Sequence, residues 1–236
     1  MIQIYTGTPG SGKSLHMAKD ICDALEKTDC EVLANFTISQ YDKSGKKVFK
    51  DEQFSRFHYV SDDELKPSYL INFAENYWAE HDRNINHNKY EQQIRLYIDE
   101  AQQHFNSRDW QKNNTCKIKD KWTWFFSVHR HFGFKITLCS QLLSNLDKQV
   151  RGVIEYELHH RKLANMGAGG AFFNLLFGGN MYLCVCCWAP MHMKISQSFF
   201  RYKDKFGNLY DTHAMFCDDR SPVLPDQGAE AELRAI

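Results

Sequence analysis

The sequence lacks a surplus of charge of either sign. Its 236 residues include 29 Lys and Arg and 29 Asp and Glu, so the formal net charge at pH 7 is zero with histidine neutral. A chain without net charge has no overall field that would draw it onto nucleic acid or an anionic membrane. Contact with either partner would therefore have to come from a local patch of charge.

A leader and an evident membrane anchor are also missing from the pattern. The first predicted strand begins at Ile2, and we therefore expect no signal peptide. Residues 171–190 are mostly apolar over a length that could cross a bilayer, but the Gly-Gly-Asn sequence at 178–180 divides them. The second half has the aromatic and β-branched character of a buried strand. We therefore expect buried core there, and a chain that is soluble and cytoplasmic as it stands.

A disulfide framework is likewise not evident. The eight cysteines are scattered along the chain, and we expect free thiols. Cys184, Cys186 and Cys187 lie near His192, a group that could suggest a metal site. Alternating strand positions point to opposite faces, however, and zinc-binding cysteines are usually brought together by a turn. The spacing therefore disfavours metal binding by this group.

What the sequence does contain is a phosphate-binding loop. Residues 7–14 read GTPGSGKS and fit the pattern G-x-x-x-x-G-K-S/T at every fixed position. A short apolar strand precedes the loop and a helical pattern follows it, so backbone N–H groups and the positive end of a helix dipole would meet at one point. The residues expected to bind the nucleotide are Gly7, Thr8, Pro9, Gly10, Ser11, Gly12, Lys13, Ser14 and Leu15.

Two of these residues have more specific expected roles. Lys13 should reach the β- and γ-phosphates of ATP, and the hydroxyl of Ser14 should hold Mg²⁺. A second landmark supports this chemistry, because the apolar strand at 94–98 ends abruptly in Asp99 and Glu100. In phosphate-loop hydrolases this is the Walker B position, where Asp99 would hold Mg²⁺ and Glu100 would activate the attacking water. The alternative is a strand that simply ends at solvent.

The remaining pattern fits one α/β domain of ordinary composition. We expect the domain to cover residues 1–217, with a polar tail over 218–236. Further strands are predicted at 31–36, 56–60, 136–139 and 154–163, followed by several β segments over 181–216. Helices are predicted over 14–27, from Pro67 onward, over 117–131 and over 142–150.

Several blocks of sequence carry a resemblance to a known family. Besides the loop, these are YIDEAQ at 97–102, HRHFGF at 129–134, SQ at 140–141, YELHHRKL at 156–163 and YDTH at 210–213. In this order and spacing, the chain from residue 1 to about 212 resembles the cytoplasmic domain of the Zot family. These are filamentous-phage morphogenesis ATPases related to the gene I protein.

The resemblance implies a P-loop NTPase fold of the additional-strand, catalytic-glutamate class, with a mainly parallel central sheet flanked by helices and a β-rich C-terminal extension. It implies a Mg-dependent ATPase at the cytoplasmic face of the host inner membrane. There, a homo-oligomeric ring would work with phage assembly and coat proteins to export single-stranded phage DNA. The family typically continues into a transmembrane helix, whereas we expect a polar tail at that point of this chain. On this reading the chain is a truncated cytoplasmic domain or the membrane part lies elsewhere, and membrane attachment would use a segment missing from this chain.

The resemblance also suggests two further site residues. Gln141, at the end of a strand beside the Walker B strand, would sense the γ-phosphate. Arg130, in the HRH block, would contact a phosphate, across a subunit boundary if the protein is a ring. Arg108 and Arg151 are rival candidates for that contact.

Two other functions stay open at this point. A nucleotide or nucleoside kinase also opens with a strand and a phosphate loop, but it should have an arginine-rich lid and an acceptor pocket. A non-hydrolysing scaffold would bind ATP only to control assembly, and would have no need of a base such as Glu100. A GTPase is disfavoured, because the N-K-Y-E sequence at 88–91 ends in the wrong residue and precedes the Walker B strand.

Overall fold

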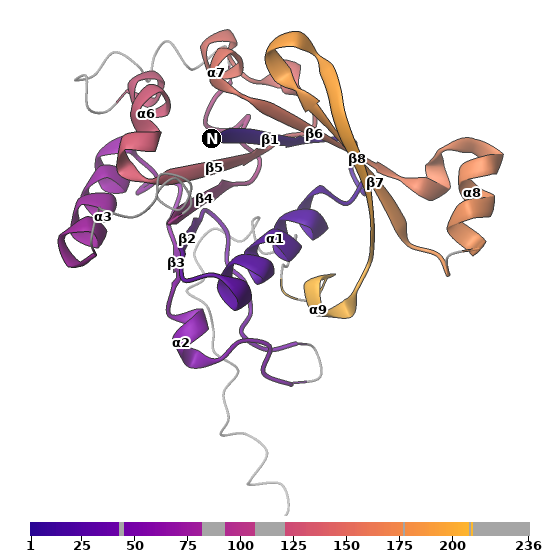
Figure 1. Cartoon of the computed structure of the whole chain (residues 1–236), viewed down its shortest axis with the longest axis horizontal. Helices are drawn as coiled ribbons and strands as arrows, with labels where there is room; N and C mark the ends of the chain where they lie inside the picture. The colour runs from indigo at the N-terminus through magenta and orange to yellow at the C-terminus, as the bar shows by residue number, and fades with distance from the viewer. Residues whose placement is uncertain (43–44, 82–92, 107–120, 177, 208, 210–236) are drawn as a thin grey trace, which may run out of the picture.

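A computed structural model describes residues 1–42, 45–81, 93–106, 121–176, 178–207 and 209. Its centre is a single eight-stranded sheet with the strand order β3-β2-β4-β5-β1-β6-β7-β8 (Figure 1). The strands are β1 (Ile2–Thr6), β2 (Glu31–Ala34), β3 (Phe57–Tyr59), β4 (Ile94–Ile98), β5 (Phe134–Cys139), β6 (Tyr156–Lys162), β7 (Met181–Trp188) and β8 (Met193–Arg201).

In this spatial order the neighbouring strands from β3 to β6 are all parallel, whereas the pairs β6–β7 and β7–β8 are antiparallel. Every residue of β1 and of β4 is buried, as expected for strands covered on both faces. The predicted mainly parallel sheet with a β-rich C-terminal extension is therefore confirmed. β5 lies between β1 and β4, which is the arrangement that the additional-strand class requires.

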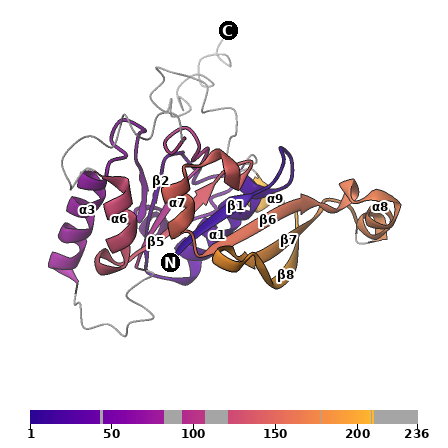
Figure 2. The same cartoon turned by 90° about the horizontal axis from the view of Figure 1, so that it is seen from above.

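Helices cover both faces of the sheet and divide the core into two layers (Figures 1 and 2). One layer holds Ile2 and Ile4 of β1 and is covered by α3 (Pro67–Glu80), α6 (Trp122–Val128) and α7 (Lys148–Val153). The other layer holds Tyr5 and is covered by α1 (Lys13–Lys27) and the short α9 (Asp204–Gly207). Successive strand residues point to opposite faces, so β1 contributes to both layers.

The smaller elements complete the chain. They are α2 (Asp51–Phe54), α8 (Gly167–Leu176), and the 3₁₀ turns η2 (His129–Phe132), η3 (Leu143–Asn145), η4 (Leu163–Asn165) and η5 (Ala189–Met191). The apolar stretch at 171–190 divides into the end of α8 and the strand β7, as the Gly-Gly-Asn sequence predicted. The expectation of buried core is wrong for the first half, because Phe172, Leu175 and Leu176 of α8 are 64%, 78% and 64% exposed. Within the described residues, none of the helices combines the length and the apolar character that crossing a membrane requires.

The structure corrects one predicted helix. Residues 142–150 do not form a continuous helix, because η3 ends at Asn145 and α7 begins only at Lys148. Asp147 starts the new helix, since its side-chain oxygen accepts a hydrogen bond from the Gln149 amide at 2.8 Å. Residues 117–120, Arg108, the block at 210–213 and the predicted tail at 218–236 lie outside the described residues.

Candidate functional site

The loop between β1 and α1 has a backbone that only glycine suits at two positions. Gly7 and Gly12 have φ angles of 142° and 95°, in the region that L side chains rarely adopt. A Cβ on Gly7 would lie 2.4 Å from the carbonyl oxygen of His160, and one on Gly12 would lie 2.6 Å from the ring of Tyr182. The loop is therefore packed closely against β6 and β7, with no room for larger residues at these points.

Lys13 folds back over the same loop. Its ammonium group donates hydrogen bonds to the carbonyl oxygens of Gly7 at 2.7 Å and Thr8 at 3.2 Å. Ser14 follows in the first turn of α1, where it is half-buried. The lysine and the serine hydroxyl thus belong to the first turn of one helix, whose N-terminus carries a partial positive charge.

Backbone hydrogen bonds place the carboxyl ends of three strands side by side. The amide of Gly7, after β1, donates to the carbonyl oxygen of Gln141, after β5, at 3.1 Å. On the other side of β5, the amide of Ala101, after β4, donates to the carbonyl oxygen of Cys139 at 2.8 Å. The structure therefore brings the loop, the Asp99–Glu100 pair and Gln141 to one edge of the sheet. Gln141 itself is exposed.

Asp99 is buried, with 5% of its surface exposed, and a residue that sequence reasoning missed holds it in place. The amide of Asp99 donates to the Asn35 side-chain oxygen at 2.8 Å, and the Asn35 side-chain nitrogen donates to the Asp99 carbonyl oxygen at 3.2 Å. Asn35 directly follows the apolar strand β2, as Asp99 follows β4. A polar residue directly after a predicted strand was the feature of the sequence that could have identified Asn35 as part of the site.

The next residue has an unusual backbone. Glu100 has a φ of 46°, which is uncommon for a residue other than glycine and is found preferentially at functional sites. Its amide donates to the Asp99 carboxylate at 2.8 Å, and its own carboxylate accepts from the side chain of Gln102. Burial, together with the adjacent Asp99 carboxylate, raises the pKa of the Cys139 thiol well above its ordinary value. The thiol beside Asp99 is therefore protonated.

Arg130 does not lie at this edge of the sheet. It therefore cannot contact a phosphate bound at the loop of its own chain. It belongs to η2, which leads into the amino end of β5, and it forms an ion pair with Glu155 just before β6. The neighbouring His129 contacts the N-terminal amine of Met1 at 2.9 Å. Because β1, β5 and β6 are parallel, this is the end of the sheet opposite the loop. Whether Arg130 contacts a phosphate of a neighbouring subunit stays a prediction.

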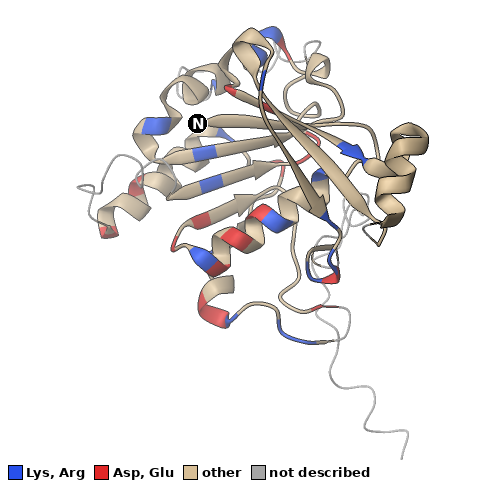
Figure 3. Ribbon diagram, turned by 45° about the vertical axis from the view of Figure 1, so that its right-hand side comes forward, with Lys and Arg blue, Asp and Glu red and all other residues tan. Residues whose placement is uncertain are grey.

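Charged residues of both signs are interspersed along α1 rather than separated (Figure 3). On this helix Asp23 forms ion pairs with Lys19 and Lys27, at 2.8 and 2.5 Å. The partly buried Asp20, also on α1, accepts from the Tyr97 hydroxyl of β4 at 2.8 Å and lies 3.6 Å from Arg95 of the same strand. Neighbouring charges of α1 are thus paired with one another.

Two histidines behind the loop are kept neutral. Burial lowers the pKa of His160 to about 3, and the neighbouring His16 adds to this effect. Burial also lowers the pKa of His16 to about 4, against an opposing contribution from Asp20. Both rings are therefore uncharged near neutral pH.

A glycine loop between β1 and α1 is typical of the P-loop NTPase fold, and β5, inserted between β1 and the strand β4 that precedes Asp99 and Glu100, is typical of its additional-strand class. The structure is similar to a solved structure described as an ATPase domain, with a TM-score of 0.56 over 89% of this chain and 84% of that one. The sequence identity is 8%, so this likeness concerns the fold alone.

The family model described as "Zonular occludens toxin (Zot)" matches residues 1–177, and the chain belongs to the Zot family. The N-terminal domain of zonular occludens toxin from Neisseria meningitidis is 21% identical, with a TM-score of 0.48 over 89% of this chain and 98% of that one. The genome packaging NTPase B204 from Sulfolobus turreted icosahedral virus 2, in complex with AMPPCP, is 12% identical, with a TM-score of 0.46 over 85% and 96%. No curated protein matches the sequence.

Proposed function

We propose that this chain binds ATP with Mg²⁺ and hydrolyses the ATP, as the motor of filamentous-phage assembly and export at the host inner membrane. The observation that carries the proposal is the meeting of three strand ends at one edge of the sheet. There the loop of β1, the acidic pair of β4 and Gln141 of β5 are linked by the hydrogen bonds from Gly7 to Gln141 and from Ala101 to Cys139. Family membership supports the role in phage export.

The residues present suit a magnesium nucleotide. The loop leads directly into the N-terminus of α1, whose partial positive charge favours a phosphate, and Gly7 and Gly12 supply the positive φ angles of this turn. A serine hydroxyl and a carboxylate are oxygen ligands, which Mg²⁺ prefers, and Ser14 and Asp99 would hold it. When bound, the ion neutralises charge on the phosphate oxygens.

Each residue of the site would then have a separate role in hydrolysis. Lys13 would exchange its hydrogen bonds to the carbonyls of Gly7 and Thr8 for the β- and γ-phosphates. Glu100 would accept a proton from the attacking water, and Gln141 would orient that water or the γ-phosphate. Asn35 would keep the Asp99–Glu100 turn in position from the neighbouring strand β2.

The wider setting follows from the family and is part of the proposal. Subunits would form a homo-oligomeric ring, with Arg130 as one candidate for the cation that a neighbour supplies. Coat and assembly proteins, and single-stranded phage DNA, would be partners. The site of action would be the cytoplasmic face of the inner membrane.

The test is ATP hydrolysis measured as a function of protein concentration, with and without single-stranded DNA or membrane vesicles. A motor should release ADP and phosphate with water as the acceptor, and its activity per subunit should rise as the ring assembles. Phosphate transfer to an added nucleoside or nucleotide, and not to water, would replace the proposal by the kinase alternative. ATP binding that changes the oligomeric state without any turnover would replace it by the scaffold alternative.

A further inference from the structure

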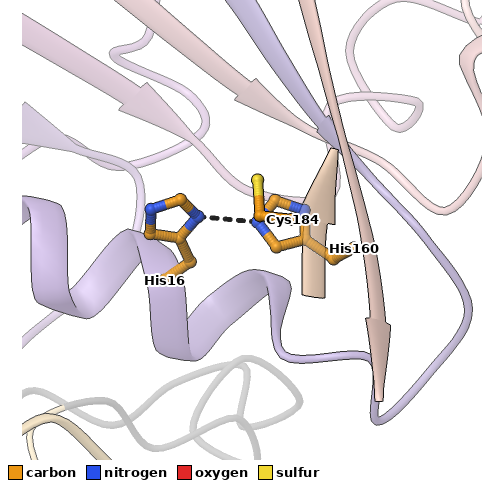
Figure 4. Close-up of side chains that lie close together, drawn as sticks. All are labelled: His16, His160 and Cys184. Carbon is orange, nitrogen blue, oxygen red and sulfur yellow. Dashed lines mark hydrogen bonds between the residues drawn. The ribbon is translucent and has the colours of Figure 1, made fainter. Parts of the chain in front are cut away.

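Three potential metal ligands meet behind the phosphate loop, from three different elements. They are His16 in the first turns of α1, His160 on β6 and Cys184 on β7 (Figure 4). One ligand atom from each residue lies within 4.8 Å of those of the other two. His16 Nδ1 and His160 Nε2 are 2.7 Å apart. The cluster consists of two imidazoles and one thiol. It differs from the group of Cys184, Cys186 and Cys187 near His192, whose spacing disfavours metal binding.

The sheet itself aligns two of these residues. His160 and Cys184 are direct partners in the antiparallel pair β6–β7, so their side chains point to the same face. The side chain of His160 is fully buried and that of Cys184 is 3% exposed. A cluster so placed is shielded from bulk water, and ligands from paired strands keep a fixed separation.

Aromatic rings fix the orientation of the third residue. The imidazole of His16 is stacked on Tyr5, with ring centroids 4.9 Å apart, and on Phe200, with centroids 4.8 Å apart. Both rings lie nearly parallel to the imidazole, so one edge of His16 is left to face His160, as Figure 4 shows. The ligand atom is thus already directed toward the cluster.

Hydrogen bonding also presents His160 as a ligand. Its Nδ1 lies 3.3 Å from the carbonyl oxygen of Thr6, and a carbonyl can only accept, so this nitrogen carries the proton. Nε2 then offers its lone pair to the cluster. A backbone carbonyl on the second ring nitrogen is the usual arrangement for metal-binding histidines, where it fixes the tautomer and the ring.

We propose that His16, His160 and Cys184 form a binding site for a thiophilic transition metal ion, with Zn²⁺ the principal candidate. Two neutral imidazoles and one thiolate are ligands that Zn²⁺ prefers, and a water molecule would complete a tetrahedral set. On binding, the Cys184 thiol releases its proton to solvent, and the proton on His16 Nδ1 moves to Nε2 of the same ring. The two ligand nitrogens would separate from 2.7 Å to roughly 3.3 Å, the value for tetrahedral Zn–N bonds of about 2.0–2.1 Å.

The site would tie the C-terminal extension to the phosphate loop. His16 lies two residues after Ser14, whereas Cys184 lies beyond residue 177, where the match to the family model ends. A bound ion would therefore join the first turn of α1 to β7. The proposal does not depend on ATP hydrolysis, because the three ligands are distinct from the residues assigned to the nucleotide.

The test uses the whole chain, freed of metal with a chelator and titrated with Co²⁺ in the absence of nucleotide. The expected result is a thiolate-to-cobalt charge-transfer band that saturates at one equivalent and disappears when Zn²⁺ is added. Cys184→Ser should lose the band, whereas Cys186→Ser, which removes the next thiol on the same face of β7, should keep it. Absence of the band in the wild type, or its survival in Cys184→Ser, would overturn the proposal.

A second measurement on the wild-type protein covers the case in which Cys184→Ser fails to fold. X-ray absorption at the zinc edge should show one sulfur and two imidazole nitrogens around the ion. A shell of oxygen atoms alone would show binding at a carboxylate site and would contradict the assignment. A buried histidine pair that only fills the core would bind no stoichiometric metal in either measurement.

Discussion

The side chain of Asn35 forms two hydrogen bonds with the backbone of Asp99, one to its amide and one to its carbonyl. The two residues are separated by 64 positions in the sequence, and each follows the carboxyl end of a neighbouring parallel strand. Through this pair, β2 fixes the turn that carries Asp99 and Glu100. The position of the acidic pair therefore depends on a residue that has no proposed contact with the nucleotide.

Replacing Asn35 should disturb both stability and activity. Asn35→Ala leaves the buried amide and carbonyl of Asp99 without these partners, and we expect the free energy of unfolding to fall by about 1–3 kcal/mol. ATP turnover should fall as well, because Glu100 is no longer held. Denaturant unfolding and an ATPase assay measure the two effects. Asn145→Ala, at an exposed position of η3, is the control and should change stability by no more than about 0.5 kcal/mol.

Lys13→Ala should abolish ATP binding or reduce turnover to background. The ammonium group is the expected contact to the β- and γ-phosphates, and a methyl group cannot replace it. Isothermal titration with ATP and Mg²⁺ measures the affinity. Lys19→Ala removes another cation of α1, one that is paired with Asp23 on the surface, and should leave binding intact. Full ATPase activity in Lys13→Ala would exclude the assigned loop.

Glu100→Gln separates binding from chemistry. The amide keeps the shape of the side chain but cannot take a proton, so we expect unchanged ATP affinity and a rate lower by on the order of 10²–10⁴. Single-turnover hydrolysis measures the chemical step. Glu52→Gln, at an exposed position of α2, should be neutral. If Glu100→Gln hydrolysed ATP at the wild-type rate, another residue would have to act as the base.

Glycine substitutions should have opposite effects at two positions. Gly12→Ala places a methyl group 2.6 Å from the Tyr182 ring at a φ of 95°, so we expect a loss of stability and of ATP binding. Gly152→Ala, within α7, meets open space at an ordinary φ and should raise stability by roughly 0.5–1 kcal/mol. Thermal unfolding with and without ATP compares them. A fully stable, ATP-binding Gly12→Ala protein would contradict the loop conformation.

Acid should destabilise the fold through buried histidine. Burial, with the N-terminal amine next in effect, lowers the pKa of His129 to about 4, against an ordinary value of 6.5. Below pH 6.5 the His129 side chain is protonated in the unfolded chain but stays neutral in the folded chain. The contribution of this residue to the free energy of unfolding is therefore greatest above pH 6.5, and it decreases as the pH drops toward 4. The loss is about 3 kcal/mol for this residue.

Unfolding free energies measured between about pH 7 and pH 4 test this dependence. His129→Gln should show a shallower fall over that range, because glutamine does not titrate. His16 and His160 have pKa values shifted in the same direction and account for part of the remaining slope. An unchanged slope in His129→Gln would mean that this ring takes up its proton as readily in the folded state.

Local sequence was sufficient to predict the parts of the site that lie within one stretch of chain. Three glycines followed by Lys13 and Ser14, between a strand and a helix, admit few other structures. The Asp99–Glu100 pair was predictable because two adjacent carboxylates at the end of a buried strand cost free energy unless a ligand or hydrogen bonds compensate their charge. These residues could be assigned to an edge of the sheet because the carboxyl ends of parallel strands meet there.

The remaining features depend on contacts between distant segments, which local patterns do not encode. Nothing around Asn35 indicates that its partner is Asp99. Cys184 was considered with its neighbours in the sequence, whereas its partner across the sheet is His160. Arg130 was assigned from a family block, and such a block does not say which end of the sheet its side chain occupies.

The position of β1 in the sheet has a consequence for the order in which the protein is made. Ile2 pairs with Ile136 on one side, and Gln3 pairs with Tyr156 on the other, so the first strand has no neighbours until those segments exist. During synthesis the phosphate loop leaves the ribosome early, yet the strands that shape it follow after more than half of the chain. Pairing over such separations is slow. A nascent chain that ends before β6 should therefore be unable to retain nucleotide.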